Sequence, residues 1–218
     1  KRGGNVFTTV LPIHAQKTLA VLGKSSLFAD SYLAGGTALA LQLGHRESID
    51  FDFFTQTPFD PMKLSRQLSG LGSFIETVAK GISLIGEFNQ VKMSCFQYEY
   101  PLLEKTTVYE GISIAHIHDI AAMKLVAISD RSTKKDYIDL YTLAHKGVSF
   151  DVMFALYEQK YHAFEANKFT LIKSMTYFQD AELGEMPRML VPISWEDVKT
   201  FLISESMRLG KKYLEDNL

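Results

Sequence analysis

Hydrophobic and polar positions follow two different periods along this chain, and the change between them falls near residue 116. Before that point, segments that alternate in the manner of strands are interspersed with apolar stretches of helical period. After it, the period is helical throughout. The pattern therefore predicts an α+β protein with two domains, a mixed α/β core over 1–116 and a helical lobe over 117–218.

Turn and capping residues set the limits of the individual elements. Gly23 is predicted to end the first helix, and the Asp60-Pro61 pair to begin another. The predicted helices are 12–23, 37–43, 59–71, 119–130, 133–145, 150–161, 167–179 and 195–214. The predicted strands are 26–34, 48–55, 73–80, 82–88, 91–100 and 111–116.

Composition narrows the class of protein. The 218 residues are 46% apolar, which is enough for a globular core, and the formal net charge of −2 gives no general attraction to nucleic acid. The one cysteine, Cys95, excludes a disulfide framework and a cysteine-based zinc site. We find no secretory signal and no apolar run of about 18 residues, so we expect a cytoplasmic protein that does not enter the membrane.

The stretch from Tyr32 to Phe54, YLAGGTALALQLGHRESIDFDFF, carries the chemistry of the first half. Asp50 and Asp52 are one residue apart in a predicted strand, so both face one side, about 7 Å apart, with phenylalanines on the other. Two carboxylates facing one way repel each other unless a cation lies between them, and oxygen ligands suit Mg²⁺. A solvated strand end without a ligand is the alternative.

The Gly35-Gly36-Thr37 turn favours the metal interpretation. Glycines allow close approach of a ligand to the backbone, and the first turn of the helix after them presents N–H groups to phosphate. A phosphate-binding turn and a metal-binding strand can hold two parts of one nucleoside triphosphate (NTP).

This arrangement resembles the signature of the DNA-polymerase-β-like nucleotidyltransferase superfamily, in which Gly-Ser precedes two acidic residues that flank an apolar one. Thr37 replaces the usual serine and keeps its hydroxyl. The resemblance implies that Asp50 and Asp52 are catalytic ligands of Mg²⁺ (or Mn²⁺) and that Gly35, Gly36 and Thr37 bind the nucleotide.

A second block, DIAAMKLVAISDRSTKKDYIDLYTLAH at 119–145, is similar to a motif of the AbiEii toxin-like nucleotidyltransferases. The resemblance implies that Lys124 contacts the nucleotide phosphates and that Asp139 is a catalytic or structural acid, with Arg131 and Asp136 beside the nucleotide. By spacing alone, Lys124 and Arg131 share one helix face and the two aspartates share the next, which equally predicts an inter-helix ion-pair network. Both roles can coexist.

Catalysis of the polymerase-β type uses a third acidic residue on a later strand, and here Ser94 occupies the expected position. The chain offers alternatives at Glu76, Glu87, Glu99 and Asp139. A chain without a third acid could also be a non-catalytic nucleotide- or partner-binding member of the same fold.

Basic residues of the chain are candidates for binding the nucleotide and an RNA acceptor. Arg46 suits phosphate geometry and is a candidate nucleotide ligand, whereas we expect His45 on a solvated loop. The resemblance implies a toxin with a cognate antitoxin, acting on an RNA such as tRNA or on a protein. An RNA would need a local basic surface, for which the candidates are Arg46, Lys105, Lys134, Lys135 and Lys173.

Two other enzyme classes also use an Asp-x-Asp motif. Haloacid-dehalogenase-type phosphatases carry Thr or Val two residues after the second aspartate, where this chain has Phe54. Glycosyltransferases share the metal chemistry but leave the Gly-Gly-Thr turn without a role. Nucleotidyl transfer accounts for both features.

Overall fold

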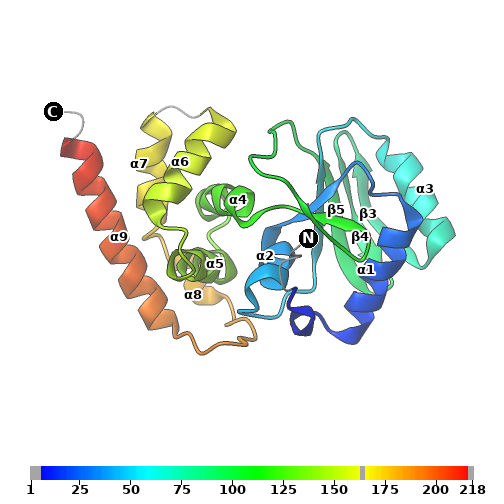
Figure 1. Ribbon diagram of the computed structural model, residues 1–218, viewed down its shortest axis with the longest axis horizontal. Coiled ribbons are helices and arrows are strands. Elements are labelled where there is room, and N and C mark those ends of the chain that lie inside the picture. Colours follow the sequence, from blue (N-terminus) through cyan, green and yellow to red (C-terminus); the bar gives the residue numbers. More distant parts are fainter. Residues whose placement is uncertain (1–5, 163–164, 216–218) are drawn as a thin grey trace. The chain divides into compact units, whose positions relative to one another are not determined.

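The computed structural model describes residues 6–162 and 165–215. The chain divides into two compact units, Lys1–His116 and Ile117–Leu218 (Figure 1). The first contains a seven-stranded mixed sheet and the second is built from helices, so the predicted α+β class is confirmed. Within the described ranges, no helix is both long and apolar enough to span a bilayer.

The first unit is organised around its sheet, whose strand order is β3-β4-β5-β2-β1-β7-β6. Strand β2 pairs antiparallel with β1 and parallel with β5, which places it centrally. The strands are β1 (Tyr32–Ala34), β2 (Phe51–Thr55), β3 (Phe74–Lys80), β4 (Ser83–Phe88), β5 (Val91–Gln97), β6 (Thr107–Tyr109) and β7 (Ile112–Ile114).

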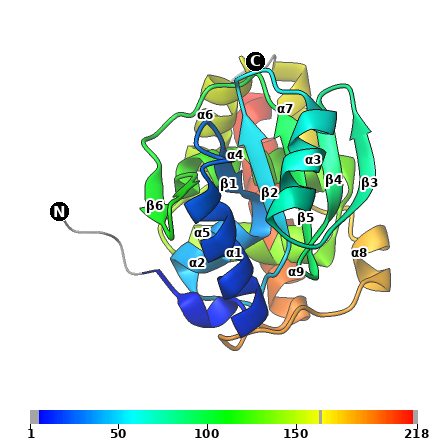
Figure 2. The same ribbon diagram turned by 90° about the vertical axis from the view of Figure 1, so that its right-hand side faces the viewer.

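Four helical segments accompany this sheet. They are η1 (Thr8–Val10), α1 (Ile13–Ser25), α2 (Gly35–Leu43) and α3 (Pro61–Leu71). Helices α1 and α3 cover one face of the sheet (Figure 2). The core under them includes Phe51 and Phe53 of β2, both fully buried, and Phe53 stacks on Phe28 at a centroid distance of 4.0 Å.

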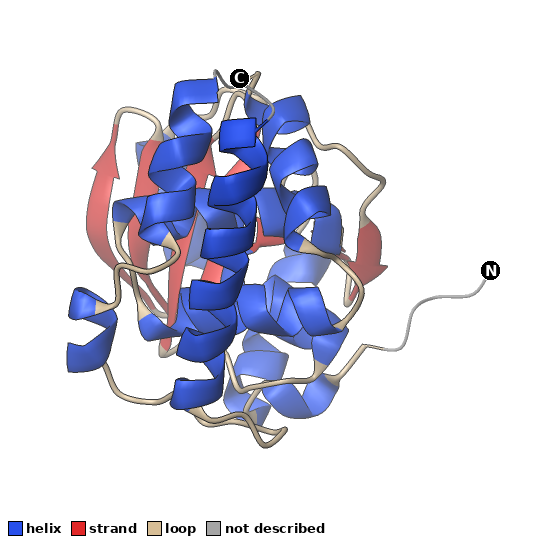
Figure 3. Ribbon diagram, turned by 90° about the vertical axis from the view of Figure 1, so that its left-hand side faces the viewer, coloured by secondary structure: helices blue, strands red, loops and turns tan. Residues whose placement is uncertain are grey.

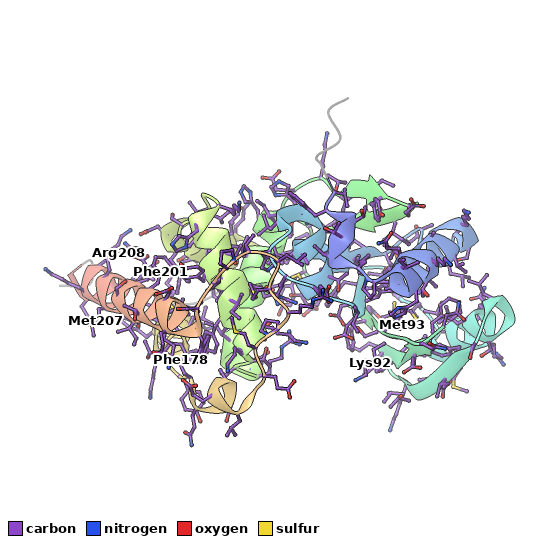
Figure 4. The ribbon with its side chains drawn as sticks, turned by 90° about the horizontal axis from the view of Figure 1, so that it is seen from below. Lys92, Met93, Phe178, Phe201, Met207 and Arg208 are labelled. Carbon is purple, nitrogen blue, oxygen red and sulfur yellow. The ribbon has the colours of Figure 1, made fainter. Side chains whose placement is uncertain are left out.

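The alternation along the strands determines which residues reach this core. Lys92 and Met93 (labelled in Figure 4) are successive residues of β5. Lys92 is exposed, whereas Met93 is 3% exposed and pairs with Phe51. Cross-strand partners face the same side of a sheet, so Met93 belongs to the core side and Lys92 to the opposite side.

Several predicted boundaries in this unit are wrong, and two of them have a clear structural cause. The strand predicted over 26–34 covers only Tyr32–Ala34, because Ser26 adopts a left-handed conformation (φ +58°) and the residues after it form turns. Gly23 does not end α1, which continues to Ser25. A Cβ at Gly23 would lie 1.8 Å from the carbonyl oxygen of Glu110, so this glycine permits close packing inside the helix.

The second unit consists of helices (blue in Figure 3). They are α4 (Ile117–Asp130), α5 (Lys134–His145), α6 (Phe150–Tyr161), α7 (Glu165–Ser174), α8 (Gln179–Leu183) and α9 (Trp195–Glu215). The helix predicted over 167–179 therefore ends early, at Ser174, and after a turn α8 begins at Gln179. Phe201 of α9 packs against Tyr141 and Phe150, and it is labelled in Figure 4.

Candidate active site

The Gly35-Gly36-Thr37 turn is the junction between β1 and α2. Gly35 has φ +67°, a left-handed conformation that favours glycine. A Cβ at this residue would lie 2.9 Å from Asp52 Oδ2. The glycine therefore serves both the backbone conformation and the close approach of the Asp52 carboxylate to the turn.

Asp52 occupies the centre of this arrangement. On β2 it pairs with Ala34 of β1 on one side and with Ser94 of β5 on the other. Ser94 Oγ donates a hydrogen bond of 2.7 Å to Asp52 Oδ1. The half-buried carboxylate is thus held by one neighbouring strand and faces the glycine turn that follows the other.

Asp50 lies directly before β2, although the predicted strand over 48–55 included it. Its carbonyl oxygen accepts a hydrogen bond of 2.6 Å from Thr37 Oγ1, and that hydroxyl also lies 2.9 Å from Ser48 Oγ. Thr37 is 1% exposed. Its hydroxyl therefore joins α2 to the segment before β2, and a phosphate at this turn would have to use backbone N–H groups.

Arg46 and His45 are buried, with 2% and 0% exposure. The prediction of a solvated loop at His45 is wrong. Arg46 Nη1 donates to the carbonyl of Glu47 at 3.0 Å, and a Cβ on Gly36 would lie 2.5 Å from Arg46 Nη2. A buried guanidinium thus lies against the turn, where its charge favours an anion, and Arg46 no longer counts toward an exposed basic surface.

The sheet register limits the choice of a third acid. Ser94 is the β5 partner of Asp52. Glu76 pairs with Gly86, which pairs with Met93, so it faces the core side; there it accepts a hydrogen bond from Ser65 of α3.

The other two candidate glutamates, Glu87 and Glu99, lie away from Asp52 for different reasons. Glu87 pairs with Lys92 of β5 and so faces the same side as Asp52. It lies on β4, two strands away at a spacing of about 10 Å. Glu99 follows β5 beyond Gln97, the partner of Thr55 at the opposite end of β2. Neither lies beside Asp52.

A divalent metal fits this site only with ligands from the substrate. Among the described residues, no group of three or more His, Cys, Asp or Glu side chains is placed to hold an ion. Mg²⁺ is commonly bound by one or two carboxylates together with waters and substrate phosphates, and the oxygen donors of Asp50 and Asp52 match that requirement.

The second motif block forms a buried ion-pair network between α4 and α5. Lys124 Nζ lies 2.6 Å from Asp136 Oδ1 and 2.6 Å from Asp139 Oδ2. Arg131 binds Asp136 through both Nε and Nη2, at 2.9 and 3.0 Å, and Thr133 also donates to it. The network predicted from helix spacing is present, while roles in nucleotide binding stay a prediction.

A further buried pair joins α6 to α4, where Lys160 Nζ lies 2.8 Å from Asp119 Oδ1 and both side chains are fully buried. No pattern in the sequence predicted this pair. No short spacing relates these residues, and only the packing of α6 on α4 brings them together.

The stability that this network contributes depends on pH through the pKa of Asp136. Burial on its own raises the pKa of Asp136, but Lys124 and Arg131 outweigh burial and hold this pKa well below its ordinary value of 3.8. A carboxyl whose pKa is lower in the folded state stabilises the protein above its unfolded pKa. That stabilisation is lost as the pH falls below 3.8 toward the folded pKa.

We therefore expect the free-energy advantage of wild type over Asp136→Asn to shrink as the pH is lowered from about 5 to about 3. Urea unfolding of the two proteins at each pH measures it. In the variant, Asp139 still pairs with Lys124, so the comparison isolates Asp136. An advantage that stays constant over this range would contradict the assignment.

The remaining basic candidates are on both units. Lys105 is exposed on the first unit, and Lys135 and Lys173 are exposed on the second. Lys134 donates to the carbonyl of Gly184 at 2.7 Å and lies 5.2 Å from the ring centroid of Trp195. Three of the five predicted residues are therefore exposed, Lys134 is half-buried and Arg46 is buried.

Comparison with known proteins identifies relatives over most of the chain. The sequence model of the family described as "Nucleotidyl transferase AbiEii toxin, Type IV TA system" matches residues 17–106 and 97–208. An uncharacterized protein of Aquifex aeolicus (strain VF5) is 41% identical over 192 residues, covering 86% of this chain and 89% of that protein.

Two solved structures share the fold. JHP933 of Helicobacter pylori aligns with a TM-score of 0.57 at 20% identity, over 95% of this chain and 96% of that one. The nucleotidyltransferase toxin MenT4 of Mycobacterium tuberculosis H37Rv aligns with a TM-score of 0.50 at 13% identity, over 89% of this chain and 87% of that one. At these identities the likeness shows a common fold.

Proposed function

The chain belongs to the AbiEii nucleotidyltransferase toxin family, as its two motif blocks predicted, and on this premise we propose that it transfers a nucleotide from an NTP to RNA with the help of Mg²⁺. The observation that carries the proposal is the approach of Asp52 to the glycine turn, where a Cβ at Gly35 would lie 2.9 Å from Asp52 Oδ2. A carboxylate that binds metal and a turn that binds phosphate are thus adjacent.

Each part of the site has a role in the proposed reaction. The backbone N–H groups of Gly36 and Thr37 bind the β- and γ-phosphates, and buried Arg46 adds positive charge behind them. Asp50 and Asp52 hold the metal, which neutralises charge on the phosphates when it is bound. Ser94 fixes one oxygen of Asp52 and leaves the other toward the turn.

The transfer replaces one phosphorus–oxygen bond by another. A hydroxyl oxygen of the acceptor bonds to the α-phosphorus, the bond from that phosphorus to the bridging oxygen breaks, and pyrophosphate leaves. The hydroxyl proton passes to solvent, because no third carboxylate lies beside Asp52 in the sheet. Such transfers depend mainly on positioning and charge neutralisation, which these residues supply.

The biological setting is part of the same proposal. The family description names a toxin of a toxin–antitoxin system, and we infer a cognate antitoxin as partner and the cytoplasm as the place of action. The family roles of Lys124, Arg131, Asp136 and Asp139 in nucleotide binding or catalysis also belong to the proposal, beside the ion-pair network that they form.

Label transfer tests this function directly. The protein is incubated with Mg²⁺, each labelled NTP in turn, and total cellular RNA and protein, and the fraction that gains label is identified. We expect label on RNA with at least one NTP, and none with EDTA or with Asp50→Ala. Label on protein would replace RNA as the acceptor class, and NTP binding without any transfer would favour a non-catalytic member of the fold.

A further inference from the structure

The face of the sheet that carries Asp52 has small residues around that carboxylate. Ala34, Asp52 and Ser94 are successive cross-strand partners on β1, β2 and β5, and they form one row across the sheet. Neither Ala34 nor Ser94 extends beyond the carboxylate, and Gly35 follows directly. Ala34 and Ser94 are buried, and Asp52 is the half-buried member of this acid row, so Asp52 is the residue of the row that a ligand can reach.

The next row on the same face is aromatic. Tyr32, Phe54 and Phe96 are the cross-strand partners two residues further along each strand. The ring centroids of Tyr32 and Phe96 each lie 5.9 Å from that of Phe54, and Tyr98 lies 5.3 Å from it. These four residues are termed the aromatic row.

The aromatic row is separate from the core of the sheet. Phe51 and Phe53 face the other side and are fully buried there. Tyr32 is 5% exposed, whereas Phe54, Phe96 and Tyr98 are half-buried, so these three offer ring surface to a ligand. The row lies about 7 Å from the acid row, because two residues of a strand span this distance.

The order of features along β1 fixes the direction in which a substrate lies. Tyr32 belongs to the aromatic row and Ala34 to the acid row. Gly35 then begins the glycine turn. The turn and the aromatic row are therefore on opposite sides of Asp52. With pyrophosphate leaving toward the turn, the acceptor must approach from the opposite side, since the attacking and leaving oxygens are in line.

We propose that the aromatic row is the acceptor site and that it binds the unpaired terminal base of an RNA by stacking. This inference rests on the proposed function, because it needs phosphates at the turn. Aromatic side chains stack on any base, so the row selects an unpaired end without reading its sequence. A protein hydroxyl as acceptor would have no need of such a surface.

Binding of a short probe tests the proposal. The probe is a fluorescently labelled single-stranded ribo-oligonucleotide, compared with the same sequence in a blunt duplex, and fluorescence anisotropy gives the dissociation constant. We expect wild type to prefer the single strand and Phe96→Leu to weaken its binding about tenfold, the effect of one lost stack. Phe96→Tyr should retain the affinity, because it retains a ring.

Phe74→Leu is the matched control. Phe74 is also a half-buried phenylalanine on a strand, but its partner Phe88 faces the core side. This variant should bind the oligonucleotide as wild type does. Thermal melting checks that both leucine variants are folded. If Phe96→Leu does not fold, Tyr98→Leu, which also removes a ring from the aromatic row, takes its place.

NTP binding separates this inference from the proposed function. Thermal stabilisation by Mg²⁺-NTP should be the same in wild type and Phe96→Leu, because the phosphates bind at the turn. If NTP binds but Phe96→Leu and Phe74→Leu affect oligonucleotide binding equally, the acceptor site is wrong while the proposed function stands. If NTP does not bind wild type, the proposed function itself fails.

Discussion

Asp52→Asn is expected to reduce nucleotidyl transfer by on the order of 10³-fold while the protein stays folded. A metal ligand supplies several kcal/mol of transition-state stabilisation, and a loss of about 4 kcal/mol corresponds to this factor. The substitution keeps the size of the side chain, and its amide oxygen can still accept the hydrogen bond from Ser94. Packing is therefore conserved while the negative charge is removed.

Initial rates of label transfer at several Mg²⁺ concentrations measure this effect. Added metal should not restore the rate of Asp52→Asn, since the neutral side chain is a weak ligand. Asp30→Asn is the matched control: Asp30 is an exposed carboxylate of the same unit, and only its backbone carbonyl has a described role, accepting from Thr55. Near-wild-type transfer by Asp52→Asn, or a melting temperature low enough to explain the loss, would refute the assignment.

The position of Asp52 followed from local pattern because strands impose a period of two. Alternation alone indicated that Phe51 and Phe53 face a core and that Asp52 faces away, and both phenylalanines are fully buried. The same period placed Ser94 in the register of the expected third acid, where it pairs with Asp52. Short-range periodicity thus predicted which residues lie together at the centre of the candidate site.

The surroundings of that centre could not be predicted in this way. His45 and Arg46 stand in a polar segment, GHRES, which suggests a solvated loop. They are buried because the chain folds Arg46 against Gly36, ten residues earlier, and no periodic signal encodes that contact. The aromatic row could not be predicted for a related reason. It forms only when three strands that are far apart in the sequence pair with one another.

The ion-pair network around Lys124 could be predicted from the sequence only in part. Helix spacing predicted which faces carry Lys124 and the two aspartates, and the three side chains meet. Helix spacing could not predict how deeply these side chains are buried. The Lys124 side chain is 4% exposed, and the carboxylates of Asp136 and Asp139 are fully buried. Burial changes the energetics, because an ion pair at the surface contributes little, whereas a buried charge that loses its partner is strongly destabilising.

Lys124→Met is therefore expected to lower the free energy of unfolding by about 3–5 kcal/mol. It leaves Asp139 buried without this cation, whereas Asp136 keeps the bidentate pair with Arg131. Adding Asp139→Asn removes the buried carboxylate that lost Lys124, so the double variant should regain part of the stability. Lys135→Met, an exposed lysine of the same helix pair, should change the stability by no more than about 0.5 kcal/mol.

Urea unfolding gives these stabilities, and label transfer at a temperature where all variants are folded gives the second measurement. If Lys124 also stabilises charge on the triphosphate, Lys124→Met should be strongly impaired in transfer even where it is folded, because folding does not restore the cation, and this variant keeps Asp139. Full transfer by the folded double variant would assign Lys124 to the ion-pair network alone. A loss below about 1 kcal/mol in Lys124→Met would contradict the buried network itself, since removal of one partner from such a pair has a far larger effect.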